Sequence, residues 1–226
     1  AKKFGTADAK VYADYKELLK DESIEVVHVL TPNREHAQIS IDALYAGKHV
    51  MCEKPMAKTA EEAKRMCEAA KATGKLLTIG YQHRQKAGAK YAKEVIENGD
   101  LGEIYSINAE MSTFHKPAYR KWLTNFGGGI MYILGSHLVD LIVYLLGEPK
   151  KISSFLKHTE LDGIDFEDNN LAVLEYDKAL ARIFISSVEV NGFGRRQFVV
   201  SGSEGTIEKK PIERPCYLSY SDRGMA

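Results

Sequence analysis

The most specific chemical signal in the chain is the tripeptide Glu53-Lys54-Pro55. It directly follows residues 49–52, a short apolar run typical of a buried parallel strand. Ligands of open α/β sheets bind beyond the carboxyl ends of the strands, so Lys54 is expected at a ligand crevice. An isolated Glu-Lys pair is usually a solvated surface pair. This position instead favours a lysine that stabilises a developing alkoxide, with Pro55 fixing its backbone.

Polar residues also follow two other apolar runs. Thr31-Pro32-Asn33 comes after residues 26–30, and His36 lies at the start of the next helical segment. These groups are suited to contact a cofactor, although a turn capped by Thr31 or Asn33 accounts for them equally well.

The third polar segment, Tyr81-Gln82-His83-Arg84, follows a run that ends at Gly80. If the chain stays extended there, Gln82 and Arg84 lie on alternate sides, and one of them faces the crevice.

A glycine-rich segment leads into the most apolar helical stretch, residues 130–146. Gly127-Gly128-Gly129 allows the backbone to approach a ligand and directs the amino end of the helix toward it. Gly135-Ser136-His137 follows, and we expect His137 two turns into the helix. A histidine on an apolar helix is usually a hydrogen-bonded core residue. The glycines beside His137 favour a functional role instead.

The first half of the chain alternates apolar runs with helix-period segments, the pattern of a parallel α/β sheet. The nearly unbroken apolar run of residues 26–30 predicts a strand covered on both faces by helices. Thr59 and Glu62 form a capping-box pattern, and the helix that they begin is expected to end at Gly74. The sequence therefore predicts two successive strand–helix–strand crossover units.

Beyond Gly80 the pattern changes to strands of a mixed, largely antiparallel sheet, predicted at residues 170–176, 181–190 and 197–201. Residues 211–226 are polar without a clear period and are expected to form a tail.

Composition narrows the class of protein. The 226 residues are 44% hydrophobic, and 31 basic residues balance 31 acidic ones. Without a net positive field, neither nucleic acid nor a membrane is an expected partner. The three cysteines Cys52, Cys67 and Cys216 suggest neither a disulfide framework nor a metal site. No apolar run approaches the roughly 20 residues that cross a bilayer. We therefore expect a cytoplasmic protein without a metal.

Taken together, Thr31-Pro32-Asn33 with His36, Glu53-Lys54-Pro55, Gln82 with Arg84, and the triple glycine before Gly135-Ser136-His137 resemble the Gfo/Idh/MocA oxidoreductase family. The resemblance covers nearly the whole chain. It implies an α/β fold in which a Rossmann domain with a parallel sheet precedes an α/β domain with a largely antiparallel open sheet. Residues 1–82 would be the carboxyl-terminal part of the NAD(P)-binding Rossmann domain. Residues 83–226 would form an incomplete domain for substrate binding and oligomerisation.

The resemblance also implies roles for single residues. Lys54 and His137 correspond to the catalytic lysine and the acid/base histidine of the family. Cofactor-lining positions correspond to Thr31, Pro32, Asn33, His36, Glu53, Lys54 and Gln82. The substrate side is assigned to Arg84, Tyr119, Trp122 and Asp140.

Two features depart from the family pattern. Ile133 occupies the position, four residues before His137, where many family dehydrogenases have an aspartate. Asp140 is a candidate to hydrogen-bond the imidazole instead, and a structural role accounts for it equally well. The glycine fingerprint of a first βαβ unit, and the residue that distinguishes NAD from NADP, are also missing. We interpret the chain as truncated at its amino end.

The expected function is hydride transfer between NAD or NADP and a secondary hydroxyl of a sugar, sugar derivative or polyol, in a homo-oligomer such as a dimer or tetramer. A redox-assisted lyase or glycosidase with bound NAD, which would not accumulate NADH, is the first alternative. A non-catalytic sugar or nucleotide sensor on the same fold is the second, and the retention of both Lys54 and His137 argues against it.

Overall fold

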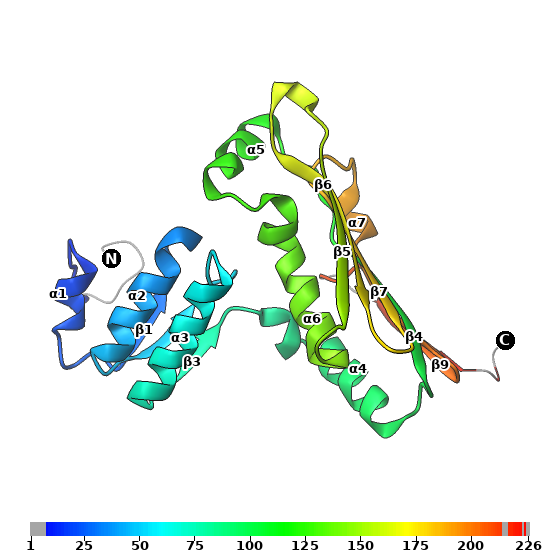
Figure 1. Cartoon of the computed structure of the whole chain (residues 1–226), viewed down its shortest axis with the longest axis horizontal. Helices are drawn as coiled ribbons and strands as arrows, with labels where there is room; N and C mark the ends of the chain where they lie inside the picture. Colours follow the sequence, from blue (N-terminus) through cyan, green and yellow to red (C-terminus); the bar gives the residue numbers. More distant parts are fainter. Residues whose placement is uncertain (1–7, 214–216, 223, 225–226) are drawn as a thin grey trace. The chain divides into compact units, whose positions relative to one another are not determined.

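The chain divides into two compact units in its computed structural model, residues 1–80 and residues 81–226 (Figure 1). The structure describes residues 8–213, 217–222 and 224, so Cys216 lies outside the described residues. Each unit has its own cluster of buried apolar side chains, and we describe each unit by itself.

The first unit is built around a three-stranded parallel sheet with the order β1-β2-β3. Helix α1 (Tyr15–Leu19) precedes β1 (Val26–Val29), and α2 (Asn33–Tyr45) connects β1 to β2 (His49–Cys52). Helix α3 (Ala60–Thr73) then connects β2 to β3 (Leu77–Ile79). The two predicted crossover units are confirmed.

Local signals in the sequence set the limits of α3. The Thr59 side chain accepts a hydrogen bond from the Glu62 amide at 3.1 Å, and the Glu62 carboxylate accepts from the Thr59 amide at 3.2 Å. This reciprocal pair is a capping box, and it satisfies two amides that the first helical turn leaves without a partner. At the other end Gly74 has φ of 65°, a left-handed conformation that glycine adopts without strain.

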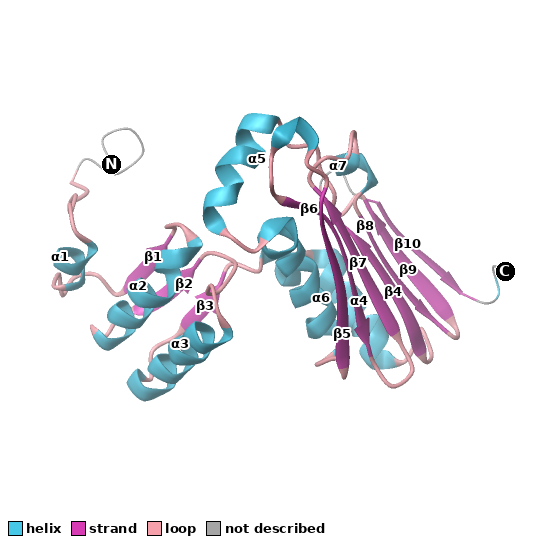
Figure 2. Ribbon diagram, turned by 45° about the horizontal axis from the view of Figure 1, so that its top comes forward, coloured by secondary structure: helices cyan, strands magenta, loops and turns pink. Residues whose placement is uncertain are grey.

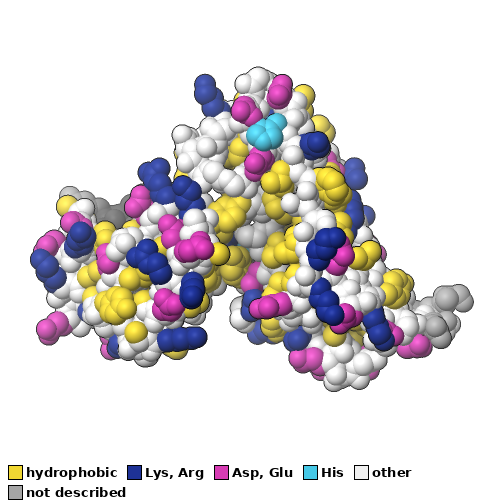
Figure 3. Space-filling model, in the orientation of Figure 1, with side chains coloured by type: hydrophobic (Ala, Val, Ile, Leu, Met, Phe, Trp, Pro, Cys, Tyr) yellow, Lys and Arg dark blue, Asp and Glu magenta, His cyan; other side chains and the backbone are white. Residues whose placement is uncertain are grey.

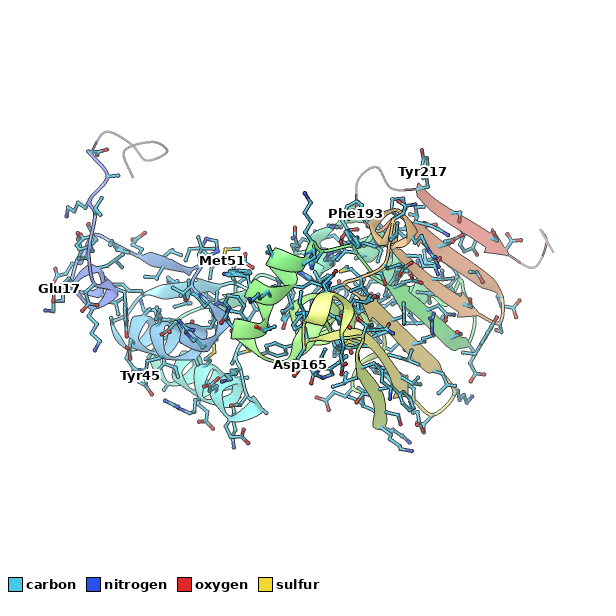
Figure 4. All side chains as sticks on the ribbon, turned by 90° about the horizontal axis from the view of Figure 1, so that it is seen from above. Glu17, Tyr45, Met51, Asp165, Phe193 and Tyr217 are labelled. Atoms are coloured by element: carbon cyan, nitrogen blue, oxygen red, sulfur yellow. The ribbon has the colours of Figure 1, made fainter. Side chains whose placement is uncertain are left out.

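Helices α2 and α3 cover one face of this sheet. Val27 and Val29 are buried beneath them, whereas Val26 and His28 on the same strand are exposed. Met51 lies on the side of the sheet away from these helices (Figure 4) and is 40% exposed. The prediction that helices cover both faces of residues 26–30 is therefore wrong for the described residues, which supply helices to one face.

The second unit contains a seven-stranded sheet with the order β10-β9-β8-β4-β7-β6-β5. Its strands are β4 (Ile104–Glu110), β5 (Lys151–His158), β6 (Glu167–Glu175), β7 (Leu180–Ser186), β8 (Gln197–Gly202), β9 (Gly205–Lys210) and β10 (Tyr217–Asp222). The β4–β7 pair is parallel and all other pairs are antiparallel. This confirms a largely antiparallel sheet.

Helices α4 (Ala87–Asn98) and α6 (Ser136–Leu146) lie on one face of this sheet (Figure 2). The remaining helical segments are short: η1 (Gln82–Gln85), α5 (Pro117–Leu123), η2 (Thr124–Phe126), η3 (Met131–Gly135), η4 (Leu161–Gly163) and α7 (Gly192–Arg195). Strand β6 alternates strictly between half-buried and buried residues, with its buried side chains facing the helices. The opposite face of the sheet carries apolar side chains such as Phe155, which is 57% exposed.

Two segments differ from the predictions. Residues 217–222, predicted as part of a tail, form β10, because the segment pairs with β9 and Tyr220 packs against the core. Residues 82–85 form a 3₁₀ turn, so Gln82 and Arg84 do not alternate as they would on an extended chain. Residues 131–135 form a π-helical turn inside a helical backbone that runs from residue 129 into α6, so His137, the second residue of α6, lies two turns in as predicted.

The surface mixes both signs of charge, and Figure 3 shows acidic and basic side chains interspersed over the face drawn. Among the described residues, no single helix is long and apolar enough to cross a bilayer. The two helical segments Pro117–Phe126 and Met131–Leu146 reach that length together only across a bend of 78°.

Candidate active site residues

The carboxyl ends of the three parallel strands bring the first group of predicted residues to one edge of the first unit. The Glu53 amide donates to the Val29 carbonyl at 3.0 Å, and the Gly80 amide donates to the Cys52 carbonyl at 2.8 Å. These bonds continue the ladder one residue past each strand. Glu53-Lys54-Pro55 therefore emerges between the segments that follow β1 and β3, at the edge where open α/β sheets bind ligands.

His36 links two of these segments by hydrogen bonds. Its Nδ1 lies 2.8 Å from the Pro55 carbonyl oxygen, its Nε2 lies 2.9 Å from the Thr31 carbonyl oxygen, and the side chain is buried. A neutral imidazole donates one of these two hydrogen bonds, whereas the imidazolium donates both. His36 thus ties the Thr31-Pro32 turn to the segment that carries Lys54, and both of its nitrogens face the backbone.

Lys54 is half-buried beside a carboxylate. Burial lowers the pKa of the Lys54 ammonium, while the neighbouring charge of Glu53 opposes that change. The Lys54 amide donates to Glu53 Oε2 at 3.2 Å, and the Lys54–Pro55 peptide bond is cis. A Cβ at Gly80 would lie 3.2 Å from Glu53 Oε2, so the glycine leaves room for Glu53 to lie against the end of β3.

The other predicted cofactor residues differ in exposure. Asn33 is the first residue of α2 and is buried, whereas Thr31 and Pro32 are exposed. Gln82 belongs to the second unit, at the start of η1, and is exposed. The edge of the first sheet therefore offers an ammonium, a carboxylate and an amide.

His137 is buried near the start of α6, and other rings contact it. The ring of His83, on η1, lies edge-on to it with 4.9 Å between the centroids and 61° between the planes. The Tyr81 ring lies farther away, at 6.2 Å. Burial lowers the pKa of His83 to about 3, and electrostatic interactions with Lys86, His137, Lys209 and Arg196 act in the same direction. His83 is therefore a neutral ring at physiological pH.

Asp140 forms an ion pair with Arg84. Arg84 Nε donates to Asp140 Oδ2 at 2.8 Å, and Nη2 donates to Oδ1 at 2.5 Å. This bidentate hydrogen bonding raises the pKa of the guanidinium. Each oxygen of Asp140 thus accepts a hydrogen bond from Arg84, which gives Asp140 a structural role. The pair joins η1 to α6.

Between α6 and strands β5 and β6 is a cavity of about 600 Å³. Its wall is mostly apolar and includes the polar side chains Tyr132, Ser136, Arg84 and Asp140. Tyr119 and Trp122, the other two predicted substrate residues, are outside this lining. They form an exposed aromatic row on α5, in which their rings stack with 5.3 Å between centroids.

The triple glycine lets the backbone approach strand β6 closely. Gly127, Gly128 and Gly129 all have positive φ, of 68°, 77° and 60°. A Cβ on Gly129 would lie 2.4 Å from the Glu167 Cβ, so the backbone at Gly129 approaches β6 closely.

Ile133 lies in the π-helical turn and packs against the apolar core of the unit.

His83 has no role among the sequence-based predictions. Its ring contact with His137 depends on the 3₁₀ turn of η1, and the residues of that turn carry no strong local signal for it. Among the described residues, no group of three or more His, Cys, Asp or Glu side chains is arranged to hold a metal ion.

Comparisons with known proteins cover both units. Residues 1–81 match the model of an oxidoreductase family with an NAD-binding Rossmann fold, and residues 89–208 match that of the GFO/IDH/MocA C-terminal domain.

Individual dehydrogenases and one solved oxidoreductase structure are also similar to this chain. Levoglucosan dehydrogenase of Pseudarthrobacter phenanthrenivorans is 32% identical over 92% of this chain and 60% of its own length. D-glucoside 3-dehydrogenase of Escherichia coli is 38% identical over 66% of this chain and 43% of its own length. The solved structure of the putative oxidoreductase yvaA from Bacillus subtilis superposes with a TM-score of 0.77 and 28% identity, covering 90% of this chain and 57% of that one. The chain thus spans roughly half the length of the relatives that it matches.

Proposed function

Because the chain belongs to the Gfo/Idh/MocA oxidoreductase family, we propose that it takes part in hydride transfer between a nicotinamide cofactor and a secondary hydroxyl of a sugar, sugar derivative or polyol. The observation that carries the proposal is Lys54, a half-buried lysine with a lowered pKa at the carboxyl end of β2, in a segment that matches an NAD-binding family. The names of the relatives support the substrate class, since they include dehydrogenases of a glucoside and of levoglucosan.

The residues at this edge fit a nicotinamide cofactor, either NAD or NADP. The buried Asn33 amide and the half-buried Glu53 and Lys54 form a polar rim beyond parallel strands, as in dinucleotide-binding sheets. Thr31, Pro32, His36 and Gln82 complete the proposed contact set. When bound, the nicotinamide accepts or donates the hydride.

We assign the proton transfer and the stabilisation of negative charge to side chains of this protein. During oxidation, the substrate hydroxyl gives its proton to a ring nitrogen of His137 as the hydride leaves the carbon. The Lys54 ammonium stabilises the negative charge that develops on the same oxygen. Arg84, Tyr119, Trp122 and Asp140 are proposed on the substrate side, with Asp140 acting through its ion pair with Arg84.

We also propose that the protein assembles as a homo-oligomer through the open face of the second sheet. Phe155 and Leu171 are cross-strand partners on that face, opposite the side covered by α4 and α6. Exposed apolar side chains on an uncovered sheet face favour burial against another surface.

Steady-state turnover of glycosides and inositols with NAD and NADP tests the proposed reaction. We expect Lys54→Ala to lower kcat by about 100- to 1000-fold, the usual loss when one charge-stabilising donor is removed. Lys58→Ala is the matched control, because Lys58 is an exposed lysine four residues farther along the same segment. Normal turnover of Lys54→Ala would refute the assignment. Product formed without net NADH would favour the redox-assisted lyase instead.

A further inference from the structure

Two consecutive residues of η1 contact α6 at two positions three residues apart. His83 packs against the ring of His137, and Arg84 forms the bidentate ion pair with Asp140. Residues three apart on a helix are neighbours on its surface, so the two contacts lie side by side. Together they fix one face of α6 against η1 at the position of His137.

Ile133, one turn before His137, has no polar side-chain group and packs against the core. The Asp140 carboxylate accepts two hydrogen bonds from Arg84. The centroid of His83 is 4.9 Å from that of His137, closer than the Tyr81 ring at 6.2 Å.

We propose that His83 is a positioning residue for His137, holding the His137 ring in one orientation by edge-to-face packing. Edge-to-face contact at this separation is a favoured arrangement for paired rings. The proposal rests on the acid/base role of His137 that is proposed above. His83 is 5% exposed, so its own ring is held by the surrounding core and has little freedom to turn.

The charge state of His83 makes it suitable for this task. The groups that act on its ring are Lys86 beyond η1, His137 on α6, Lys209 on β9 and Arg196 just before β8, all of which disfavour a second positive charge. A neutral ring adds no field that would hold a proton on His137, whereas a carboxylate would favour the imidazolium. His83 can therefore orient the base without stabilising its protonated form.

Two variants separate ring packing from other contributions. His83→Phe keeps a ring of similar size, and His83→Ala removes it. We expect His83→Ala to lower kcat at least about tenfold with little change in KM, because misorientation of a catalytic group affects the chemical step more than binding. His83→Phe should retain most of the wild-type kcat. Leu145→Ala is the matched control. Leu145 is a buried residue of α6, the helix that carries His137, and it also lies near His83.

A measurement without turnover tests the contact directly. In chains labelled at histidine, the ring resonances of His137 should broaden or shift in His83→Ala and stay sharp in His83→Phe and Leu145→Ala. Unchanged resonances and unchanged kcat in His83→Ala would overturn the proposal, as would equal losses in His83→Phe and His83→Ala. If His137→Asn keeps full turnover, the proposed function fails. The resonances would then still report whether His83 orients His137.

Discussion

Lys54 illustrates how a functional group at a strand end can reduce stability. Its ammonium is half-buried, and burial lowers its pKa from 10.5, so the unfolded chain binds this proton more tightly than the folded chain. The folded state therefore carries a penalty at neutral pH that disappears as pH rises toward the unfolded value.

We predict that Lys54→Met makes the first unit more stable than the wild type at pH 7, with a gain that shrinks as pH approaches 10. The gain is limited to about 1.4 kcal/mol for each unit by which the pKa is lowered. Hydrogen exchange resolved to peptides of residues 8–80 measures it. Lys58→Met, at an exposed position, should show no such pH-dependent gain, and a gain of equal size there would contradict the explanation.

His83 is expected to control the acid stability of the second unit. Its folded pKa of about 3 lies below the ordinary value of 6.5, so the unfolded state binds a proton first as pH falls. The free energy of unfolding should decrease between these two values, by up to about 1.4 kcal/mol per pH unit. Trp122, the single tryptophan of the chain, lies in this unit, so its fluorescence during urea unfolding measures the change.

His83→Phe should flatten this acid dependence, because the variant has no group to titrate at that position. His158→Gln, a change at an exposed histidine of the same unit, serves as the control. A profile in which His83→Phe follows the wild type at every pH would show that other groups cause the acid loss.

At the scale of elements, the segment before α6 depends on glycine for two distinct reasons. Gly127 and Gly129 both have positive φ, but an added Cβ would meet nothing within 4 Å at Gly127 and would lie 2.4 Å from the Glu167 Cβ at Gly129. We predict that Gly127→Ala costs about 1 to 3 kcal/mol through backbone strain alone, because φ of 68° with ψ of 166° is a conformation that almost only glycine adopts. Gly129→Ala should cost clearly more, because β6 must also move. Trp122 fluorescence in urea compares the two, and equal losses would mean that the contact with β6 is easily relieved.

The ion pair between η1 and α6 gives a further prediction. Arg84→Met would leave the buried carboxylate of Asp140, whose side chain is 7% exposed, without its partner. We expect a loss on the order of 2 kcal/mol, below the usual value for fully buried pairs because the Arg84 side chain is 41% exposed. The double variant Arg84→Met, Asp140→Leu should recover most of that loss. Urea unfolding of the wild type, Arg84→Met, Asp140→Leu and the double variant gives the coupling energy, and additive losses would show that the pair contributes little.

At the scale of the whole molecule, the two faces of the second sheet can be tested against each other. Phe155 and Ile152 belong to the same strand and are 57% and 60% exposed, but they lie on opposite faces. If the uncovered face mediates self-association, Phe155→Glu should shift the chain toward monomer in sedimentation velocity experiments. Ile152→Glu, on the face that carries α6, should leave the distribution unchanged. Equal behaviour of the two variants would argue against this face.

Much of the candidate site follows from the sequence, because its signals are local. The capping box of Thr59 and Glu62, the turn at Gly74 and the apolar run before Glu53-Lys54-Pro55 each act over a few residues. In a parallel sheet, the order of strands and helices already brings the strand ends to one edge. The position of Lys54 beyond β2 could therefore be predicted without a structure.

Tertiary contacts decided the features of the site and the sheet that involve residues far apart in the chain. Arg84 and Asp140 are separated by 56 positions, and their pairing depends on how η1 packs on α6. The strand β10 forms because β9 supplies hydrogen-bond partners for a polar segment with little strand signal of its own. The neutrality of His83 results mainly from burial, with contributions from Lys86 nearby and from His137, Lys209 and Arg196, which are far from it in the sequence. The sequence by itself thus determined the chemistry and order of the site residues, whereas packing decided their partners and charge states, because both depend on non-local contacts and on exclusion of water.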